Sequence, residues 1–540
     1  MPMKQIITVR TPFGNTEIEA ETGDNLLERL TASGVLLRAD CGGNGVCGKC
    51  LVKIDSGLPG GDADQIPLVG EEKYRAGFRA ACQVTVREHL ILEIPEASLA
   101  VFERTDKAAL AIGFPVDFKP DSALAGYGLA VDLGTTTIAA YLCERATGRA
   151  IGSASVKNPQ LIFGEDVMSR ISASAKSPEI LSKLQQLAVS AVQQASRSLC
   201  RSANLAAEDI REMTVVGNPA MMHFFLGIDP ASLGTCPYRP AFAEARKVSA
   251  SSLGFEWNPS LEIYTAPLVS GFIGSDTVAA ALAVGMPKAP SGVMLVDVGT
   301  NGELVLTGEK KLMAASCATG PVFEGASIGC GMPATSGAVD SVSIDPKTKR
   351  VSWSVLRTAG APVKPMGLCG SGVISAAAAL LRSGMMRSDG RLVEGFAPIR
   401  SGQKCAEFVV VPAESSGTGR DIVLTQKDIR AIQLGKGALR AGIELLCRDA
   451  GLRIPESIIM SGAFGTFLSP EDVLCIGMLP KLKPSRISAA GNAAGAGAIM
   501  LLVHHGTRRA AEQLARDIQT LELAGRPDFE DAFVQAMAFE

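Results

Sequence analysis

The sequence has no apolar run long enough to span a bilayer. Its best candidate, AAGNAAGAGAIMLLVHH (489–505), is interrupted by glycines and an asparagine. The first residues, MPMKQIITVRTPFG, alternate like a strand and lack the charged head and apolar stretch of a secretion signal. We therefore expect a cytoplasmic protein that does not bind membranes.

An excess of charge of one sign is also missing. The formal net charge is −3, and acidic and basic residues are interspersed, which disfavours binding to nucleic acid or anionic membranes. Cysteine is not scarce, because the chain has 13, and in a cytoplasmic protein this number indicates metal chemistry and buried thiols rather than disulfides. At 540 residues the chain is expected to form several domains.

The most informative residues are four cysteines near the N-terminus: Cys41, Cys47, Cys50 and Cys82. Their spacing is C-x5-C-x2-C with a distant fourth thiol, one residue wider in its first gap than the plant-type 2Fe-2S pattern. Glycines fill the same loop, so the backbone can wrap closely and direct N–H groups at cluster sulfurs. The sequence therefore predicts a 2Fe-2S cluster.

Two other interpretations of these cysteines stay open. Cys47 and Cys50 form the C-x2-C pair of many zinc sites, but a zinc site of two such pairs needs a second short pair near Cys82, which the sequence lacks. Unligated thiols are the other possibility. The remaining cysteines, such as Cys317 and Cys369 beside glycines, are expected to pack in cores.

The pattern over residues 1–95 predicts a compact β-rich domain with one helix. KQIITVR alternates between apolar and polar residues, CLVKI carries β-branched residues, and Asp24 is expected to cap the helix. Residues 96–126 lack sustained periodicity and contain two prolines, which predicts a linker.

A larger α/β region begins at about residue 127 and contains an internal repeat. GLAVDLGTTT and VMLVDVGTNG align without a gap and share a D-x-G-T turn between two apolar strands. Two such hairpins imply a duplicated domain with a cleft between its lobes. We predict a middle domain (127–209) with the first hairpin and a C-terminal domain (210–540) with the second.

The two turns have the chemistry of a phosphate site. Glycine lets the turn approach an anion, and the N–H and hydroxyl groups that follow can bind phosphate oxygens. The carboxylates of Asp132 and Asp297 would hold Mg²⁺, directly or through water. The phosphate-binding candidates are Gly134, Thr135, Thr136, Thr137, Gly299, Thr300, Asn301 and Gly302. A single turn of this kind also occurs in ordinary hairpins, so structural turns remain the alternative.

Further candidates have two interpretations each. Gly370, Ser371 and Gly372 begin a predicted helix, where N–H groups favour anions, and they either line the nucleotide or form a plain cap. Glu303 follows the second turn, and it either orients an attacking water or points to solvent through strand alternation.

The hairpins resemble the two phosphate motifs of the actin, sugar kinase and Hsp70 superfamily. IIMSGAFGTFL (458–468) is similar to its adenosine motif, in which Gly462 and Gly465 leave room for adenine and ribose beside Ser461 and Ala463. GSDTVAAALAVG and GNAAGAGAIMLL are similar to the hinge helices of that fold, although Ala-rich core helices have the same composition. The resemblance implies an α/β actin-like fold (ASKHA, ribonuclease H-like) that binds ATP and Mg²⁺.

A 2Fe-2S module joined to such an ATPase resembles the reductive activators of corrinoid-dependent methyltransferases and corrinoid proteins. NPQLIFGEDVMSRI (158–171), VVGNPAMMHFFLGIDP (215–230) and GLCGSGVISAAAALL (367–381) are similar to blocks of that group, and the resemblance covers essentially the whole chain. It implies a multidomain protein with an N-terminal β-grasp, ferredoxin-like domain. Archaeal members carry 4Fe-4S motifs at the C-terminus, where this chain has no clustered cysteines, so the resemblance supports only the N-terminal cluster.

The resemblance also implies a function, the ATP-dependent reduction of a protein-bound corrinoid from Co(II) to Co(I). Asp132, Asp297 and Glu303 would be the catalytic carboxylates. The partners would be a corrinoid protein or corrinoid-dependent methyltransferase and an upstream low-potential electron donor, and the superfamily often forms homodimers. Two alternatives remain: an activator of another low-potential enzyme, and an electron-transfer or redox-sensing module that binds nucleotide without hydrolysing it.

Overall fold

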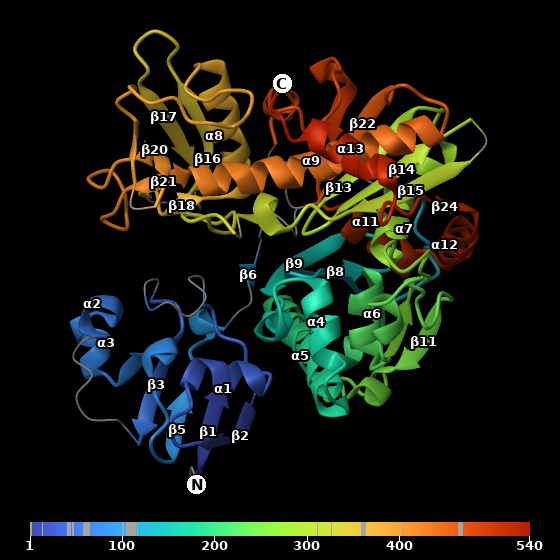
Figure 1. Cartoon of the computed structure of the whole chain (residues 1–540). Helices are drawn as coiled ribbons and strands as arrows, with labels where there is room; N and C mark the ends of the chain where they lie inside the picture. Colours follow the sequence, from blue (N-terminus) through green and yellow to red (C-terminus); the bar gives the residue numbers. More distant parts are fainter. Residues whose placement is uncertain are drawn as a thin grey trace.

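The computed structural model describes residues 3–12, 14–39, 45, 48–57, 65–99, 102–103, 115, 117–309, 311–325, 327–357, 363–402, 404–462 and 468–540. The chain forms an N-terminal domain (residues 3–99), a first lobe (102–289) and a second lobe (290–540), each built around its own sheet (Figure 1). Within these ranges, no helix has the length and apolar character needed to cross a membrane.

The N-terminal domain is a five-stranded sheet in the order β2-β1-β5-β3-β4. Its elements are β1 (Lys4–Thr11), β2 (Gly14–Glu21), α1 (Leu26–Ala32), β3 (Leu51–Ser56), α2 (Ile66–Val69), α3 (Glu71–Arg75), β4 (Phe78–Ala80), η2 (Ala81–Gln83), β5 (Leu90–Glu93) and η3 (Glu96–Ser98). β1 pairs antiparallel with β2 and parallel with β5, and Leu26 and Leu30 of α1 are buried in the domain's core. This is the β-grasp arrangement predicted from the sequence.

Two details of this domain differ from the prediction. It has the short helices α2 and α3 besides α1, whereas the sequence predicted one helix. Asn25, not Asp24, caps α1, because the Asn25 side chain accepts a hydrogen bond from the N–H of Glu28. Asp24 lies one residue too early and accepts a hydrogen bond from the N–H of Glu21 instead, at 2.8 Å.

The first lobe is a seven-stranded sheet in the order β11-β12-β10-β7-β8-β9-β6. Its elements are β6 (Phe102–Glu103), β7 (Tyr127–Leu133), β8 (Thr137–Glu144), β9 (Ala150–Lys157), η5 (Pro159–Phe163), α4 (Val167–Ser174), α5 (Pro178–Ser202), η6 (Ala207–Asp209), β10 (Ile210–Gly217), α6 (Pro219–Leu226), η7 (Ala231–Leu233), β11 (Arg246–Ser249), η8 (Ala250–Leu253), β12 (Glu262–Thr265), α7 (Ser275–Ala283) and η9 (Met286–Lys288). β7 is buried on both faces, with Val131 in the core under α5 and α6 and Ala130 in the core under α7. Because both faces are covered, β7 is apolar almost throughout.

This sheet bears on the predicted domain limits. A boundary after residue 209 would fall directly before β10, which is hydrogen-bonded in parallel to β7 within the same sheet. We therefore propose that the boundary lies near residue 290, between η9 and the first strand of the second lobe. The predicted linker also joins this sheet in part, because Phe102 and Glu103 pair with β9.

The second lobe repeats the arrangement of the first. Its elements are β13 (Val293–Val298), β14 (Gly302–Thr307), β15 (Leu312–Cys317), η10 (Pro321–Glu324), β16 (Ala338–Ile344), β17 (Val351–Val355), β18 (Gly367–Leu368), α8 (Gly370–Arg382), β19 (Ile399–Ser401), β20 (Ala406–Val411), β21 (Ile422–Thr425), α9 (Gln426–Asp449), β22 (Ser457–Ser461), α10 (Pro470–Cys475), η11 (Pro484–Arg486), β23 (Ile487–Ala489), α11 (Ala493–Val503), α12 (His505–Asp517), β24 (Gln519–Thr520) and α13 (Pro527–Ala536). The antiparallel run β13-β14-β15 matches β7-β8-β9, and β22 lies parallel to β13 as β10 lies parallel to β7. The duplication seen in the sequence is therefore present in the fold.

The lobes meet at α7 and α11, the two segments that resemble hinge helices. Gly497 of α11 lies so close to α7 that a Cβ atom there would be 2.1 Å from the carbonyl oxygen of Ala279. Only a glycine allows this crossing.

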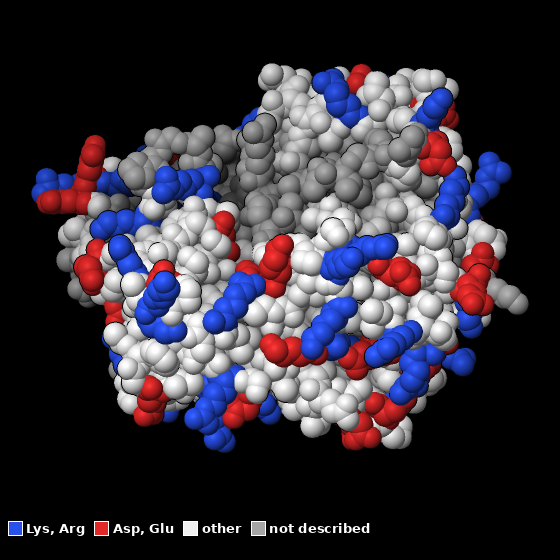
Figure 2. Space-filling view, turned by 90° about the horizontal axis from the view of Figure 1, so that it is seen from above, with Lys and Arg blue, Asp and Glu red and all other residues white. Residues whose placement is uncertain are grey.

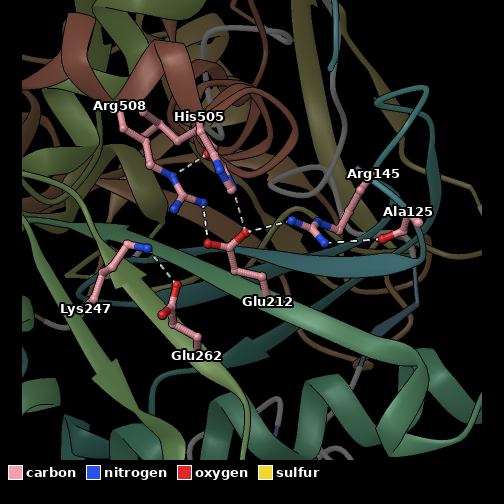
Figure 3. A network of polar contacts seen from close by, with 8 residues as sticks. Ala125, Arg145, Glu212, Lys247, Glu262, His505 and Arg508 are labelled. Atoms are coloured by element: carbon pink, nitrogen blue, oxygen red, sulfur yellow. Dashed lines mark hydrogen bonds and ion pairs between the residues drawn. The ribbon is translucent and has the colours of Figure 1, made fainter. Parts of the chain in front are cut away.

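The next helix, α12, is tied to the first lobe by polar contacts with the buried carboxylate of Glu212 (Figure 3). Glu212 at the start of β10 pairs with Arg508 at 2.6 Å, with His505 at 3.1 Å and with Arg145 at 3.1 Å. The contacts with Arg508 and His505 fasten α12 to one end of the sheet of the first lobe, whereas Arg145 belongs to that lobe itself. The aspartate turn that follows β7 lies at the other end of this sheet.

The N-terminal domain packs against the first lobe through α5. Leu36 is 3% exposed and belongs to the core of the first lobe, and its carbonyl oxygen accepts a hydrogen bond from Gln194 of α5 at 3.3 Å. Arg201 of the same helix donates to the carbonyl oxygen of Pro12.

On the face shown in Figure 2, basic and acidic side chains are interspersed.

Candidate nucleotide and cluster sites

A cavity of about 570 Å³ lies where the carboxyl ends of β7 and β13 meet. Residues from both lobes and from the N-terminal domain line it. The predicted residues in its wall are Asp132, Gly134, Thr135, Thr136, Thr137, Asp297, Gly299, Thr300, Asn301, Glu303 and Gly462. The structure thus brings both D-x-G-T turns to one cavity.

Other predicted residues lie elsewhere. Gly302 faces α9, because a Cβ atom there would be 2.6 Å from a methyl group of Leu439. Gly370, Ser371 and Gly372 begin α8 and are not among the residues that line the cavity, so their contact with nucleotide stays a prediction. Ala463 and Gly465 lie outside the described residues.

Side chains behind the first turn hold its carbonyl groups. Asn158 donates from its side chain to the carbonyl oxygen of Gly134 at 3.0 Å, and Arg170 donates to that of Thr135 at 2.8 Å. Because a trans peptide turns the following N–H to the opposite side, the N–H groups of Thr135 and Thr136 are directed away from these donors. This is the backbone arrangement of an anion-binding turn.

The second turn is held by threonine hydroxyl groups. Thr319 donates to the carbonyl oxygen of Thr300 at 3.1 Å, and the Thr300 hydroxyl donates to Glu324 at 3.1 Å. The hydroxyl groups of Thr136 and Thr300 lie 3.1 Å apart, so the two turns touch directly. A phosphate chain bound between them would contact both lobes at once.

The two aspartates are held by residues at the hinge side. Asp132 accepts a hydrogen bond from Asn492, the N-cap of α11, at 2.9 Å, and Asp297 accepts one from Ser461 at 3.3 Å. Among the described residues no three His, Cys, Asp or Glu side chains are grouped closely enough to hold a metal. Mg²⁺ usually takes only one or two carboxylates together with water and substrate phosphates, so this pair of aspartates fits it.

Gly462 directly follows β22 and lies against the second aspartate. Its φ angle is +94°, and a Cβ atom there would be 2.6 Å from both Asp297 Oδ1 and the carbonyl oxygen of Val298. The left-handed conformation and the close approach both require glycine.

Glu303 lines the cavity rather than pointing away from it. It is the cross-strand partner of Asp297 in the β13-β14 pair, and Asp276 at the start of α7 lines the same cavity. Burial and the negative charges of Asp276 and Asp297 raise the pKa of Glu303 well above its usual value. The cavity therefore holds a carboxyl group that favours its protonated form when no cation is bound.

A replacement of Glu303 by Gln is expected to stabilise the nucleotide-free protein in a pH-dependent way. The raised pKa means that the ionised carboxylate disfavours the folded state, a penalty that is absent below the pKa of the unfolded chain and grows as pH rises. We expect the melting temperature of Glu303→Gln to exceed that of the unmodified protein by on the order of 1 to 3 °C at pH 8 and to match it near pH 4.5. Thermal unfolding at both pH values measures this, and a variant equally or less stable at pH 8 would contradict it.

Of the four predicted cluster cysteines, Cys50 and Cys82 lie among the described residues. Both thiols are buried, with exposed fractions of 1% and 7%. Hydrogen bonds from Cys50, Gln83 and the N–H of Gly45 lower the pKa of Cys82 to about 6 against the opposing effect of burial. A site that stabilises thiolate in this way fits an iron-sulfur cluster. Cys41 and Cys47 lie outside the described residues.

The turn beside this site explains one of its glycines. Gly48 has a φ angle of +61°, and a Cβ atom there would be 2.7 Å from the carbonyl oxygen of Leu68. The loop can pack this closely against α2 only with glycine.

Several functional candidates were missed in the sequence. Asp276, Glu324 and Asn492 line the cavity, and Asn158 and Arg170 support its first turn. Asp276 and Asn492 had a signal in the sequence that could have identified them. Each is a polar residue next to a run of small residues, at the starts of α7 and α11.

Comparisons with known proteins cover all three parts of the chain. Residues 11–87 match the 2Fe-2S iron-sulfur cluster binding domain, residues 127–289 the RACo middle region, and residues 291–540 the C-terminal ASKHA domain of RACo. These limits place a division at residue 290, where the sheets also divide.

Relatives match along most of the chain. The corrinoid activation enzyme RamQ of Eubacterium limosum is 32% identical over 425 residues, which are 76% of this chain and 70% of RamQ. The [Co(II) methylated amine-specific corrinoid protein] reductase of Methanosarcina barkeri is 25% identical over 381 residues, 66% of each chain. The solved structure of a reductive activator for corrinoid, iron-sulfur protein superposes with a TM-score of 0.71 at 28% identity, covering 99% of this chain and 98% of the other. The chain therefore belongs to the RACo family of reductive activators of corrinoid proteins.

Proposed function

We propose that this protein reduces a protein-bound corrinoid from Co(II) to Co(I), with an electron from a 2Fe-2S cluster and free energy from ATP. One observation carries the proposal. Leu27, Leu36 and Leu37 of the cluster domain line the same cavity as the two aspartate turns. The proposed nucleotide site is therefore in direct contact with the N-terminal domain, which would carry the cluster. The relatives named for corrinoid activation and for Co(II) corrinoid reduction support the same activity.

A nucleotide is needed because the electron transfer is uphill. The Co(II)/Co(I) couple has a very low potential, and for a one-electron gap of roughly 200 mV the cost is on the order of 5 kcal/mol. A conformational change that differs between nucleotide states can supply free energy of this size. The hinge of α7 and α11, with Thr136 and Thr300 meeting across the lobes, gives such a change a structural basis.

The residues of the cavity suit ATP with Mg²⁺. The turns at 134–137 and 299–301 would bind the phosphates, and Asp132 and Asp297 would hold Mg²⁺, which neutralises phosphate charge. Glu303 is the candidate for orienting the attacking water. The segment that begins with Ser461 and Gly462 would contact the adenosine.

The cluster domain has to reach the corrinoid. In the structure its Leu36 is buried in the first lobe, and β6 is paired with β9. We infer that the N-terminal domain moves on residues 96–126 and that this movement separates Leu36 from α5. During the movement β6 either stays paired with β9 and acts as the pivot or detaches from β9. The other partner is an upstream low-potential donor that reduces the cluster.

Measuring ATP hydrolysis with and without a Co(II) corrinoid protein tests this function. We expect the partner to raise the rate about tenfold or more, because closure of the lobes is coupled to the partner complex. A redox-sensing module would show no hydrolysis. Hydrolysis that no corrinoid protein stimulates would instead favour another low-potential acceptor.

A further inference from the structure

Arg170 is the largest fully buried side chain of the described residues, with an exposed fraction of 0%. It lies in α4 directly behind the first phosphate turn. Its guanidinium donates to the carbonyl oxygens of Gly164 at 2.9 Å and Thr135 at 2.8 Å, and to the side chain of Gln160 at 3.3 Å. Every one of these acceptors is neutral.

No carboxylate of the described residues forms an ion pair with Arg170. The charges of Asp166 and Glu324 favour the cation from a distance, but neither carboxylate contacts the guanidinium: Asp166 caps α4 through Ser169, and Glu324 accepts from Thr300. Burial lowers the pKa of Arg170 to about 10, which still leaves it charged at neutral pH. A buried cation that no carboxylate contacts is costly to the folded state.

The same lobe shows how this fold neutralises other buried guanidinium groups. Arg145 and Arg508 both converge on the carboxylate of Glu212, at 3.1 Å and 2.6 Å (Figure 3). Arg170 has no equivalent of Glu212. The position of Arg170 beside the phosphate turn accounts for the difference, because the missing negative charge can come from a ligand.

The contact with the Thr135 carbonyl group links Arg170 to the cavity. Because the peptide is trans, the N–H of Thr136 points to the side opposite the guanidinium, and Thr136 lines the cavity. The hydrogen bond thus fixes the direction of this N–H, and the positive charge behind it adds to the attraction for an anion.

We propose that Arg170 is a positioning residue of the nucleotide site, whose buried charge is contacted by no carboxylate and is neutralised by the polyphosphate of the bound nucleotide. The inference rests on the proposed function, since it requires nucleotide to bind between the two turns. Arg170 selects for phosphate charge without touching the ligand.

Nucleotide binding to the full-length protein tests this proposal. Titration calorimetry with Mg²⁺ present would compare ATP, ADP, AMP and adenosine on the unmodified protein, on Arg170→Gln and on Arg170→Lys. We expect Arg170→Gln to weaken ATP about thirtyfold and ADP less, and to change adenosine affinity by less than about twofold. Arg170→Lys keeps the charge and should hold the ratio of ATP to adenosine affinity close to that of the unmodified protein.

Arg145→Gln is the matched control, because it removes a buried guanidinium whose partner, Glu212, keeps Arg508 and His505. It should leave the ATP to adenosine ratio unchanged. An equal loss for adenosine and ATP in Arg170→Gln would reduce Arg170 to a structural role and overturn the proposal, as would an unchanged ATP affinity. If Arg170→Gln does not fold, an ATP-selective loss in Arg170→Lys overturns it.

The same titrations distinguish the nucleotide function of the protein from the role of Arg170. An unmodified protein that binds none of the four compounds refutes the nucleotide function itself. Nucleotide binding that is insensitive to Arg170 refutes only the inference about this residue.

Discussion

Replacing Cys82 with serine is expected to abolish reduction of the corrinoid. The serine hydroxyl is a far weaker ligand for iron than a thiolate, and the surroundings of Cys82 lower the thiol pKa to about 6, which favours that thiolate. Iron content and the 2Fe-2S absorption and EPR signals should fall to background after reconstitution. ATP binding should persist, because both aspartate turns belong to the lobes.

Cys475→Ser is the control for this substitution. Cys475 is a partly buried thiol of α10 in the second lobe, remote in sequence from the cluster loop. Its variant should keep the iron, the spectrum and the activity. Corrinoid reduction by an iron-free Cys82→Ser protein would show that the electron does not pass through this cluster.

Replacing Asp297 with alanine is expected to lower ATP turnover by about a hundredfold to a thousandfold, because a ligand of the proposed Mg²⁺ site is lost. The variant should fold, since the substitution also relieves repulsion with Glu303 opposite it in the hairpin. The 2Fe-2S spectrum should be unchanged. Hydrolysis is followed by phosphate release, with the melting temperature recorded in parallel.

Asp345→Ala is a suitable comparison for Asp297→Ala. Asp345 is an exposed residue of the β16-β17 turn, where it accepts hydrogen bonds from the N–H groups of Lys347 and Thr348. Its loss should not affect turnover. Undiminished hydrolysis in Asp297→Ala would refute the assignment of the nucleotide site.

The sequence predicted those parts of the molecule that have short, local signals. Asp132 and Asp297 lie in turns whose glycine and hydroxyl residues are neighbours in the chain, so one motif contains most of each phosphate-binding turn. The duplication followed from aligning the two hairpins, and β7 and β13 confirm it. Cys50 and Cys82 likewise belonged to a recognisable spacing.

Residues that act across the fold were harder to predict. Asp276 reaches the cavity from α7, Glu324 from η10 and Asn492 from the start of α11, and only tertiary packing brings these segments to the turns. A limit at residue 209 would separate β10 from β7, and the pairing of two parallel strands leaves no local mark in the sequence. Arg170 belongs to no local motif, and the role proposed for it depends on the absence of a carboxylate in contact with its guanidinium.

In the proposed function, one chain uses ATP to drive an electron from its cluster to cobalt. The most direct measurement follows the EPR signal of a Co(II) corrinoid protein mixed with the reduced activator, with ATP, with a non-hydrolysable analogue or with no nucleotide. The account predicts that the Co(II) signal disappears with ATP and that Cys82→Ser and Asp297→Ala prevent this loss. Equal loss of the signal with no nucleotide would contradict it.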